Sequence, residues 1–304
     1  MKDLVIVGSG PAGLSAAVYA KRAGMDVVVL EKAGISGGQI LTTEQVDNYL
    51  GLPGIGGYDM SVKFREHAEA FGVEFMDVEV TNIQRQPENF LLTLDQEELT
   101  AKAVIVATGA THRMLGVPGE KELAGAGVSY CATCDGAFFQ GKEAAVVGGG
   151  DVALEDALYL SKLCKKVTLI HRREEFRGAK MLGEQVLGTE NIEFLPFYEV
   201  KEIRGDKKVT EVLLLQNQDG SERKISVDAV FIAVGTQPVT QWLEGIPELE
   251  KDAAGFLAAG EDCRTSEPGL YAVGDVRTKE VRQIVTAVAD GAYAIASIQK
   301  DWGK

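Results

Sequence analysis

Residues 4–13 read Leu-Val-Ile-Val-Gly-Ser-Gly-Pro-Ala-Gly, an apolar run that ends in three spaced glycines. The run predicts a short buried strand, and the alanine-rich residues 14–24 predict a helix. A second apolar run covers 27–30 and ends at Glu31. Strand, glycine turn, helix, strand and acid in this order are typical of a dinucleotide-binding unit, although the same glycines could also form a plain turn in an α/β core. The expected binding residues are Gly8, Gly10, Pro11, Ala12, Gly13 and Glu31.

These residue types suit a dinucleotide for physical reasons. Glycines let the backbone approach a pyrophosphate at a helix N-terminus, where free N–H groups and the helix dipole favour an anion. The acid at the end of the second strand accepts hydrogen bonds from a ribose diol. The first site should therefore hold a dinucleotide whose ribose carries both hydroxyls.

The same pattern recurs 140 residues later and keeps its register residue for residue. An apolar run at 144–147 leads into a second glycine turn, then a helical stretch at 154–166 and an apolar run at 167–170. This internal repeat predicts a second dinucleotide-binding unit. Its expected binding residues at the turn are Gly148, Gly150, Asp151 and Val152.

The position equivalent to Glu31 holds His171 in the second unit, and basic residues follow it. If the stretch is helical, Arg177 lies about one and a half turns further on. Replacing a carboxylate by guanidiniums suits a ribose with a 2′-phosphate, which Arg binds bidentately. The second site should therefore bind NADPH, although such a run can also be a solvated helix face. The expected ribose-binding residues are His171, Arg172, Arg173 and Arg177.

Further strand-like runs follow each glycine unit, at 73–83, 90–94 and 101–110 in the first half and at 192–200, 212–216 and 228–236 in the second. We therefore predict an α/β fold with two Rossmann-like dinucleotide-binding domains, each with a β-meander excursion. Gly and Pro at 115–120 and 236–247 indicate two crossings, so that the second domain is inserted into the first. The predicted bounds are 1–114 and 245–304 for the first domain and 115–244 for the second.

Composition excludes several classes of protein. The chain has 304 residues, 45% of them hydrophobic and 25% charged, which are values of a folded protein rather than a disordered one. A net charge of −14 disfavours nucleic acid as a partner. The first residues lack the pattern of a signal peptide, and no apolar run approaches the roughly 20 residues of a membrane span. With only four cysteines, the sequence predicts a cytoplasmic protein without membrane contact.

Cys131 and Cys134 form a CxxC pair that precedes the second glycine turn and is followed directly by Asp135. In a cytosolic protein with βαβ units, such a pair indicates a redox dithiol. The spacing puts both sulfurs on one side of a helical turn, and a helix N-terminus there would lower a thiolate pKa. Asp135 is a candidate proton donor to the leaving thiolate or to a flavin.

Zinc is the structural alternative for this pair, but it needs a second CxxC or a pair of histidines. The remaining candidates are isolated in sequence, so no metal site is expected. We expect the two other cysteines to be buried small residues and His67 and His112 to be structural. The isolated residues are Cys164, Cys263, His67, His112 and His171.

Taken together, these segments resemble the low-molecular-weight thioredoxin reductases, a class of pyridine nucleotide-disulfide oxidoreductases. These flavoproteins pass electrons from NADPH through FAD and a CxxC pair to thioredoxin. The resemblance covers essentially the whole chain. It rests on GSGPAG, the GGQ at 37–39, VDNY, ATGA, VSYCATCDGAFF, GGGDVALEDALYL, VTLIHRREEFR, VGDV and VRQIVTAVADG.

The resemblance implies a role for individual residues. Glu31 would bind the FAD ribose, Asp275 would meet the ribityl or pyrophosphate region, and Asp135 would be the acid. The residues implied near the flavin are Gly38, Gln39, Asn48, Arg282 and Gln283. Neighbours included in the expected cofactor sites are Lys32, Gly37, Thr108, Gly109, Val276, Ile284 and Gly235. The resemblance also implies NADPH on the three arginines, a dithiol of Cys131 and Cys134, thioredoxin as partner and a homodimer.

The chain departs from the family pattern at a few positions. Val152 replaces a small hydroxyl residue in the second glycine turn, Leu50 replaces a proline, and residues 58–60 are atypical. Val152 bears on the details of pyrophosphate binding, whereas the arginines keep NADPH as the favoured donor.

Other functions fit the sequence less well than this one. A reductase of the peroxiredoxin system would carry an extra N-terminal dithiol domain, whereas here the glycine fingerprint starts at residue 8. A relative reducing a glutaredoxin-like protein would differ only in its acceptor. A ferredoxin-driven relative should lack the arginines, and a non-enzymatic NADPH sensor should lack the CxxC pair.

The predicted arrangement also implies motion. Both the CxxC pair and the NADPH turn lie in the inserted domain, whereas the flavin belongs to the flanking one. A sulfur and a nicotinamide cannot share one small contact surface at once, so we expect the inserted domain to swing about its two crossings.

Overall fold

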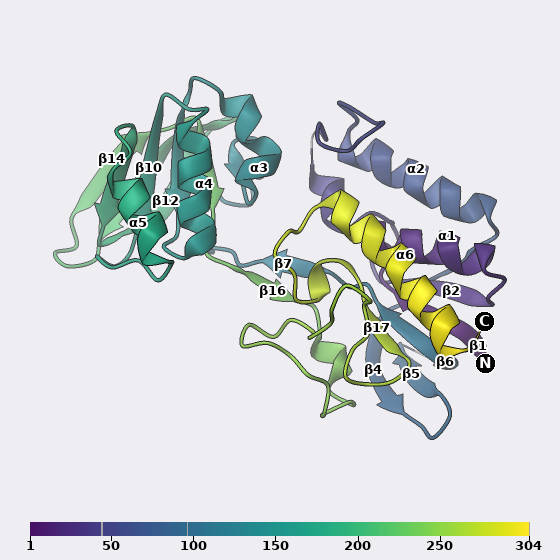
Figure 1. The fold of residues 1–304 in the computed structure, drawn as a ribbon. Coiled ribbons are helices and arrows are strands. Elements are labelled where there is room, and N and C mark those ends of the chain that lie inside the picture. Colours follow the sequence, from purple (N-terminus) through teal and green to yellow (C-terminus); the bar gives the residue numbers. More distant parts are fainter. Residues whose placement is uncertain (44, 96, 304) are drawn as a thin grey trace. The chain divides into compact units, whose positions relative to one another are not determined.

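The computed structural model describes residues 1–43, 45–95 and 97–303, and the chain divides into two compact units (Figure 1). The first unit combines residues 1–111 with residues 237–304, and the second unit is the segment 112–236 between them. The fold is α/β with two Rossmann-like halves, as predicted. None of the described helices is long and apolar enough to cross a membrane.

The first unit is built around one mixed sheet of seven strands. Its elements are β1 (Lys2–Val7), α1 (Pro11–Arg22), β2 (Val27–Glu31), η1 (Gly38–Thr42), α2 (Gly57–Ala70), β3 (Glu74–Asp77), β4 (Val80–Arg85), β5 (Phe90–Leu94), β6 (Glu98–Val106), η3 (Gln241–Leu243), β17 (Leu270–Ala272), η4 (Gly274–Val276) and α6 (Ile284–Asp301). The sheet order is β3-β2-β1-β6-β5-β4, and β17 also pairs with β6.

Strand β6 joins the two parts of this sheet. It runs parallel to β1 and to β17, and antiparallel to β5. The meander β4-β5-β6 is therefore part of the same sheet as the glycine unit, and the C-terminal strand β17 completes it. The C-terminal part of the chain, residues 237–304, belongs to the first unit.

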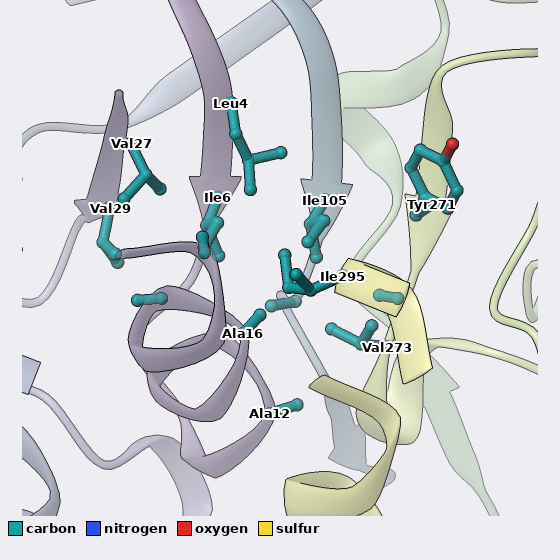
Figure 2. Close-up of a cluster of buried hydrophobic side chains, with 14 of the residues drawn as sticks. Leu4, Ile6, Ala12, Ala16, Val27, Val29, Ile105, Tyr271, Val273 and Ile295 are labelled. Atoms are coloured by element: carbon teal, nitrogen blue, oxygen red, sulfur yellow. The ribbon is translucent and has the colours of Figure 1, made fainter. Parts of the chain in front are cut away.

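One of the two large buried clusters of the first unit lies between the sheet and helices α1 and α6 (Figure 2), and the other contains the alternate residues of the same strands. Alternate residues of β1, Leu4 and Ile6, are fully buried on this side, as is Ile105 of β6. The two helices approach closely at Gly291, where a Cβ would lie only 2.6 Å from the Ala12 carbonyl oxygen. This packing fixes the position of the N-terminus of α1, into which the first glycine turn leads.

The second unit repeats the arrangement with smaller sheets. Its elements are β8 (Val128–Ser129), α3 (Ala132–Asp135), η2 (Gly136–Phe139), β9 (Glu143–Val147), α4 (Asp151–Ser161), β10 (Lys166–His171), α5 (Lys180–Leu187), β11 (Ile192–Pro196), β12 (Tyr198–Gly205), β13 (Val209–Gln216), β14 (Glu222–Ser226) and β15 (Ala229–Ile232). The parallel sheet has the order β11-β10-β9-β15-β8, and the meander β12-β13-β14 forms a separate sheet.

The chain passes between the units on two strands, β7 (Ala110–His112) and β16 (Thr236–Pro238), which pair with each other. The compact units end at 111 and 236, compared with 114 and 244 in the sequence prediction. The second difference has a physical reason. Trp242 and Leu243 are buried in the core of the first unit, so the stretch that reads as a crossing is mostly part of that unit.

Candidate active site

The first glycine turn is held in shape by close backbone contacts. Gly8 has a φ of +104°, and a Cβ there would lie 2.5 Å from the Ala107 carbonyl oxygen. A Cβ on Gly13 would lie 2.0 Å from the Gly8 carbonyl oxygen. Gly10, in contrast, has open space around its Cβ position. The turn therefore needs glycine at Gly8 and Gly13 for its own geometry, whereas Gly10 leaves free space at the N-terminus of α1.

Glu31 closes this turn from the end of β2. One carboxylate oxygen accepts hydrogen bonds from the backbone N–H and the hydroxyl of Ser9, at 2.9 and 2.7 Å. The other accepts the backbone N–H of Ala33 at 3.0 Å. Glu31 thus lies beside the glycine turn, as the motif predicted. The next residue, Lys32, is exposed and forms an ion pair with Glu79 at 3.5 Å.

Two loops of the first unit lie near this turn. Gly37 donates its backbone N–H to the carbonyl of Ser9 at 3.0 Å, which ties the Gly37–Gly38 segment to the turn. Gln39 donates its side-chain amide to the carbonyl of Ala110 at 2.8 Å. Asn48 donates to the side-chain oxygen of Gln283 at 3.0 Å, so two predicted residues distant in sequence are in contact.

The end of β6 belongs to the same unit. The Thr108 hydroxyl donates to the carbonyl of Val239 at 2.7 Å, and Gly109 has a φ of +66°. Ile284, the first residue of α6, packs against the small cluster formed by Ile40, Val46 and Met60.

Asp275 lies in η4 and has a buried oxygen, Oδ1, without a hydrogen-bond partner among the described residues. Burial raises the pKa of Asp275, whereas the charges of Lys279 and Arg282 oppose this shift. Arg282 stacks on the Phe256 ring, and its buried Nε is also unpartnered within the described chain. Val276 is fully buried beside Asp275. Buried polar atoms without partners indicate a polar ligand at this place.

The second glycine turn repeats the geometry of the first. Gly148 has a φ of +151°, and a Cβ there would lie 2.4 Å from the Ala233 carbonyl oxygen. Gly150 has open space around its Cβ position, as Gly10 has. Asp151 accepts the backbone N–H of Ala179 at 2.6 Å, while Val152 is 60% exposed.

His171 differs from its counterpart Glu31. It is buried, and a Cβ on Gly149 would lie 2.4 Å from the imidazole ring. Burial lowers the pKa of His171, which favours the neutral ring. The imidazole thus packs against Gly149 of the turn. Its Nε2 has no hydrogen-bond partner among the described residues.

The arginine segment 172–179 is not helical, because α5 begins only at Lys180. The helical position considered for Arg177, about one and a half turns beyond His171, is therefore wrong. The segment instead attaches to the glycine turn, because the backbone N–H groups of Arg177 and Gly178 donate to the Gly149 carbonyl at 2.7 and 3.2 Å. Arg172, Arg173 and Arg177 are exposed. Within the described chain, no salt bridge engages these three guanidiniums.

Cys131 and Cys134 form a disulfide around the single turn of α3, with their Cα atoms 5.3 Å apart. Both residues are partly accessible. The Ser129 hydroxyl donates to a carboxylate oxygen of Asp135 at 2.6 Å and accepts the backbone N–H of Cys131 at 3.1 Å. Ser129 therefore links the candidate acid to the redox pair, a role that no signal in the sequence indicated.

A buried carboxylate supports the segment before the disulfide. Glu120 is 1% exposed and accepts the backbone N–H groups of Leu115 and Gly116 at 3.0 and 2.7 Å. It also accepts the Tyr130 hydroxyl at 3.0 Å, and His112 stacks on Tyr130 at 5.0 Å between ring centroids. The sequence analysis missed Glu120 because it lies in the Gly- and Pro-containing stretch 115–120, which was interpreted as a crossing between domains.

Four residues remain: two cysteines expected to be buried, His67, which was expected to be structural, and Gly235, which was expected in a cofactor site. Cys164 and Cys263 are buried free thiols. His67 lies in the last turn of α2, with its ring 5.6 Å from that of Phe71. Gly235 has a φ of +109° and accepts the backbone N–H of Arg113 at 2.9 Å where the chain leaves the second unit.

Comparison with known proteins places this geometry in a family. The model of the pyridine nucleotide-disulphide oxidoreductases matches residues 2–291. The chain is 44% identical over 299 residues to a thioredoxin reductase of Listeria innocua, covering 98% of this chain and 93% of the relative. It is 42% identical over 298 residues to a thioredoxin reductase of Bacillus subtilis, with the same coverage. The solved structure of thioredoxin reductase from Streptococcus pyogenes has a TM-score of 0.94 at 41% identity and covers 100% of this chain and 98% of that one.

Proposed function

The chain belongs to the pyridine nucleotide-disulphide oxidoreductase family as a thioredoxin reductase that uses FAD and NADPH, and from this premise we propose how its residues share the reaction. Electrons pass from NADPH through FAD and a dithiol to the disulfide of thioredoxin. The observation that carries this function is the Cys131–Cys134 disulfide in the same unit as the second glycine turn. When bound, FAD accepts a hydride and passes electrons to a disulfide.

We propose that FAD is held by the first unit. The free space at Gly10 fits a pyrophosphate at the N-terminus of α1, and the unpartnered Oδ1 of Asp275 fits a hydroxyl donor of the cofactor. Glu31 would receive the ribose hydroxyls in place of its contacts with Ser9. The other predicted contacts are Pro11, Ala12, Gly13, Lys32, Gly37, Gly38, Gln39, Asn48, Thr108, Gly109, Val276, Arg282, Gln283 and Ile284.

NADPH would bind to the second unit. The free space at Gly150 fits its pyrophosphate, and the three exposed arginines are available for the 2′-phosphate. His171 would act by supporting Gly149, and a direct contact with the cofactor stays a prediction. Gly148, Asp151, Val152 and Gly235 complete the predicted site.

The dithiol passes the electrons on by disulfide exchange. Two electrons and two protons convert the Cys131–Cys134 disulfide to two thiols. The thiolate of one cysteine then attacks the thioredoxin disulfide and forms a mixed disulfide. The thiolate of the other attacks the first cysteine's sulfur in this mixed disulfide and displaces the thioredoxin thiolate. This re-forms the Cys131–Cys134 bond and releases reduced thioredoxin. Asp135, held by Ser129, is the proposed proton donor to the leaving thiolate.

We propose that turnover requires the second unit to rotate about the β7–β16 crossing. The redox pair and the NADPH turn both belong to this unit, and each must reach a flavin held by the first unit. A reversible engineered disulfide between the units should block turnover while closed and restore it on reduction. Full thioredoxin reduction by a verified locked enzyme would overturn the rotation.

We propose a cytoplasmic homodimer with FAD on residues 1–111 and 237–304 and NADPH on residues 112–236. Sedimentation of the purified protein tests the dimer: a monomer at micromolar concentration would refute it.

Replacing Cys134 by serine tests the dithiol pathway. Cys134→Ser should bind FAD and allow NADPH to bleach the flavin absorbance, yet its thioredoxin reduction should fall to background because no disulfide can re-form. Cys164→Ser is the matched control, since its buried thiol donates only to the Phe139 carbonyl. Thioredoxin reduction by Cys134→Ser at the wild-type rate would refute the pathway.

A further inference from the structure

A buried ionic cluster lies next to the proposed flavin site, and none of the steps above uses it. Asp290, in the second turn of α6, is 4% exposed. Its carboxylate binds the Arg277 guanidinium through two hydrogen bonds, at 2.9 and 2.7 Å, and the Lys279 ammonium through a third, at 2.9 Å. The side chains of Arg277 and Lys279 are only 10% and 7% exposed.

Asp290 also holds the backbone next to Asp275. Its Oδ2 accepts the backbone N–H of Gly274 at 2.8 Å. Gly274 has a φ of +71°, and a Cβ there would lie 3.0 Å from the Cβ of Ala12. The first residue of η4 is therefore fixed between α1 and α6, and the direction of the Asp275 side chain depends on it.

The two carboxylates have opposite surroundings. Asp290 receives four hydrogen-bond donations from three residues, whereas a buried oxygen of Asp275 has no hydrogen-bond partner among the residues that the structure describes. Burial raises the pKa of Asp290, and the hydrogen bonds of Arg277 and Lys279 more than reverse this, so that its net pKa shift is downward. Lys279 acts electrostatically on Asp275 as well. The lysine thus interacts electrostatically with both acids and pairs with Asp290.

We propose that Asp290 is a positioning residue for FAD: by binding Lys279 and the Gly274 N–H, it keeps Asp275 unpaired and directed at the cofactor. This inference rests on the proposed flavin site. Without the Asp290 charge, the Lys279 ammonium loses its partner in a buried place, where an unpaired charge is costly. It then pairs with Asp275 and removes that carboxylate from the flavin.

Arg277 and Lys279 differ in whether other groups would still hold them if the Asp290 charge were removed. Arg277 is also bound through Nη1 to the carbonyls of Ala259 and Thr278, at 3.2 and 3.0 Å. Within the described chain, Asp290 is the single hydrogen-bond partner of the Lys279 ammonium. Loss of Asp290 therefore frees the lysine and leaves the arginine held by two carbonyls.

This difference gives a matched pair of double variants. Asp290→Asn/Arg277→Met leaves Lys279 free, and Asp290→Asn/Lys279→Met leaves Arg277 in place. Both carry the same charge and the same number of unpaired cations, so a general loss of stability affects them alike. The measurement is the rate of FAD release from purified holoenzyme, followed by the rise in flavin fluorescence on dilution.

We expect Asp290→Asn/Arg277→Met to release FAD about tenfold to hundredfold faster than wild type, because one hydrogen bond to a charged group is lost. Asp290→Asn/Lys279→Met should stay within about threefold of wild type. Asp301→Asn is a control on the same helix: it breaks the pair of Asp301 with Arg264 and should lower the melting temperature without faster release.

Equal release rates for the two double variants would overturn the positioning role while leaving the flavin site intact. Faster release from Asp301→Asn as well would also overturn it, because any lost ion pair would then suffice. A wild-type protein without FAD would refute the proposed function itself and this inference with it.

Discussion

The two glycine turns have the same backbone and different surroundings. In each turn one glycine, Gly8 or Gly148, lies so close to a backbone carbonyl that a Cβ would clash with it. A second glycine in each turn, Gly10 or Gly150, has open space around its Cβ position. After the second strand they diverge, because Glu31 holds the turn through its carboxylate whereas His171 is sealed beneath it. We propose that the backbone binds a pyrophosphate in both units and that the residues at the end of the strand and just beyond it select the sugar.

Charge follows the same division. The first unit has 15 Lys and Arg against 26 Asp and Glu, and the second has 16 against 19. NADPH carries an additional phosphate, and the unit proposed to bind it is the less acidic one. Three predictions can break or sharpen this comparison.

The largest effect is expected from removing two arginines of the second unit. Arg172→Ala/Arg177→Ala should raise the KM for NADPH by roughly 10²- to 10⁴-fold, since each bond to a phosphate contributes about 1.5–3 kcal/mol. The KM for NADH and the flavin content should change little. Arg204→Ala is the control, because Arg204 pairs with Glu202 and Glu211. Equal losses for both nucleotides would place the 2′-phosphate elsewhere.

The next effect concerns the two helices that follow the turns. Ala16 of α1 is fully buried, and its counterpart in α4 is Asp156, whose pKa is raised to about 7 by burial and by Glu155. The folded state therefore binds this proton more tightly than the unfolded chain between about pH 4 and 7, and stability falls as the pH rises through that window.

Asp156→Asn should accordingly stabilise the protein at pH 8, by up to about 4 kcal/mol, and have little effect at pH 4. Urea unfolding at the two pH values measures this, with Glu190→Gln, at an exposed carboxylate of the same unit, as control. A gain of the same size at both pH values would mean that the ionisation of Asp156 is not the cause.

The smallest effect separates the two turns directly. Gly10→Ala and Gly150→Ala should both fold, because the added Cβ meets open space. Each methyl group would lie where a pyrophosphate is expected, so Gly10→Ala should weaken FAD binding and Gly150→Ala NADPH binding, by about tenfold. Titration of both cofactors with both variants tests this. Loss of the same cofactor in both variants would contradict the assignment of one cofactor to each turn.

The sequence predicted what depends on short-range patterns. The glycine turns, their strands and the CxxC pair each lie within a few residues, and the repeat of 140 residues made the second turn recognisable. The arginine segment was harder, because its shape is set by backbone bonds to Gly149, more than 20 residues earlier. A charge run carries no signal for such a bond.

Longer-range partners could not be predicted at all. Asp290 meets Gly274, Arg277 and Lys279, which lie 11 to 16 residues away in the chain. Nothing in the sequence distinguishes these from solvated polar residues, because burial is decided by packing of elements distant in the chain. The predicted end of the second unit differs from the observed one for the same reason, since Trp242 is buried by residues of the N-terminal sheet.

The paired strands β7 and β16 have a consequence for how such a chain can be rearranged. Because the two crossings are neighbours, the second unit enters and leaves through one narrow stem, and its own ends lie side by side. A segment with adjacent ends can be excised and bridged by a short turn at little entropic cost. The second unit is therefore an inserted domain that could be replaced. Another nucleotide-binding domain whose ends are equally close could be joined to β7 and β16 in its place.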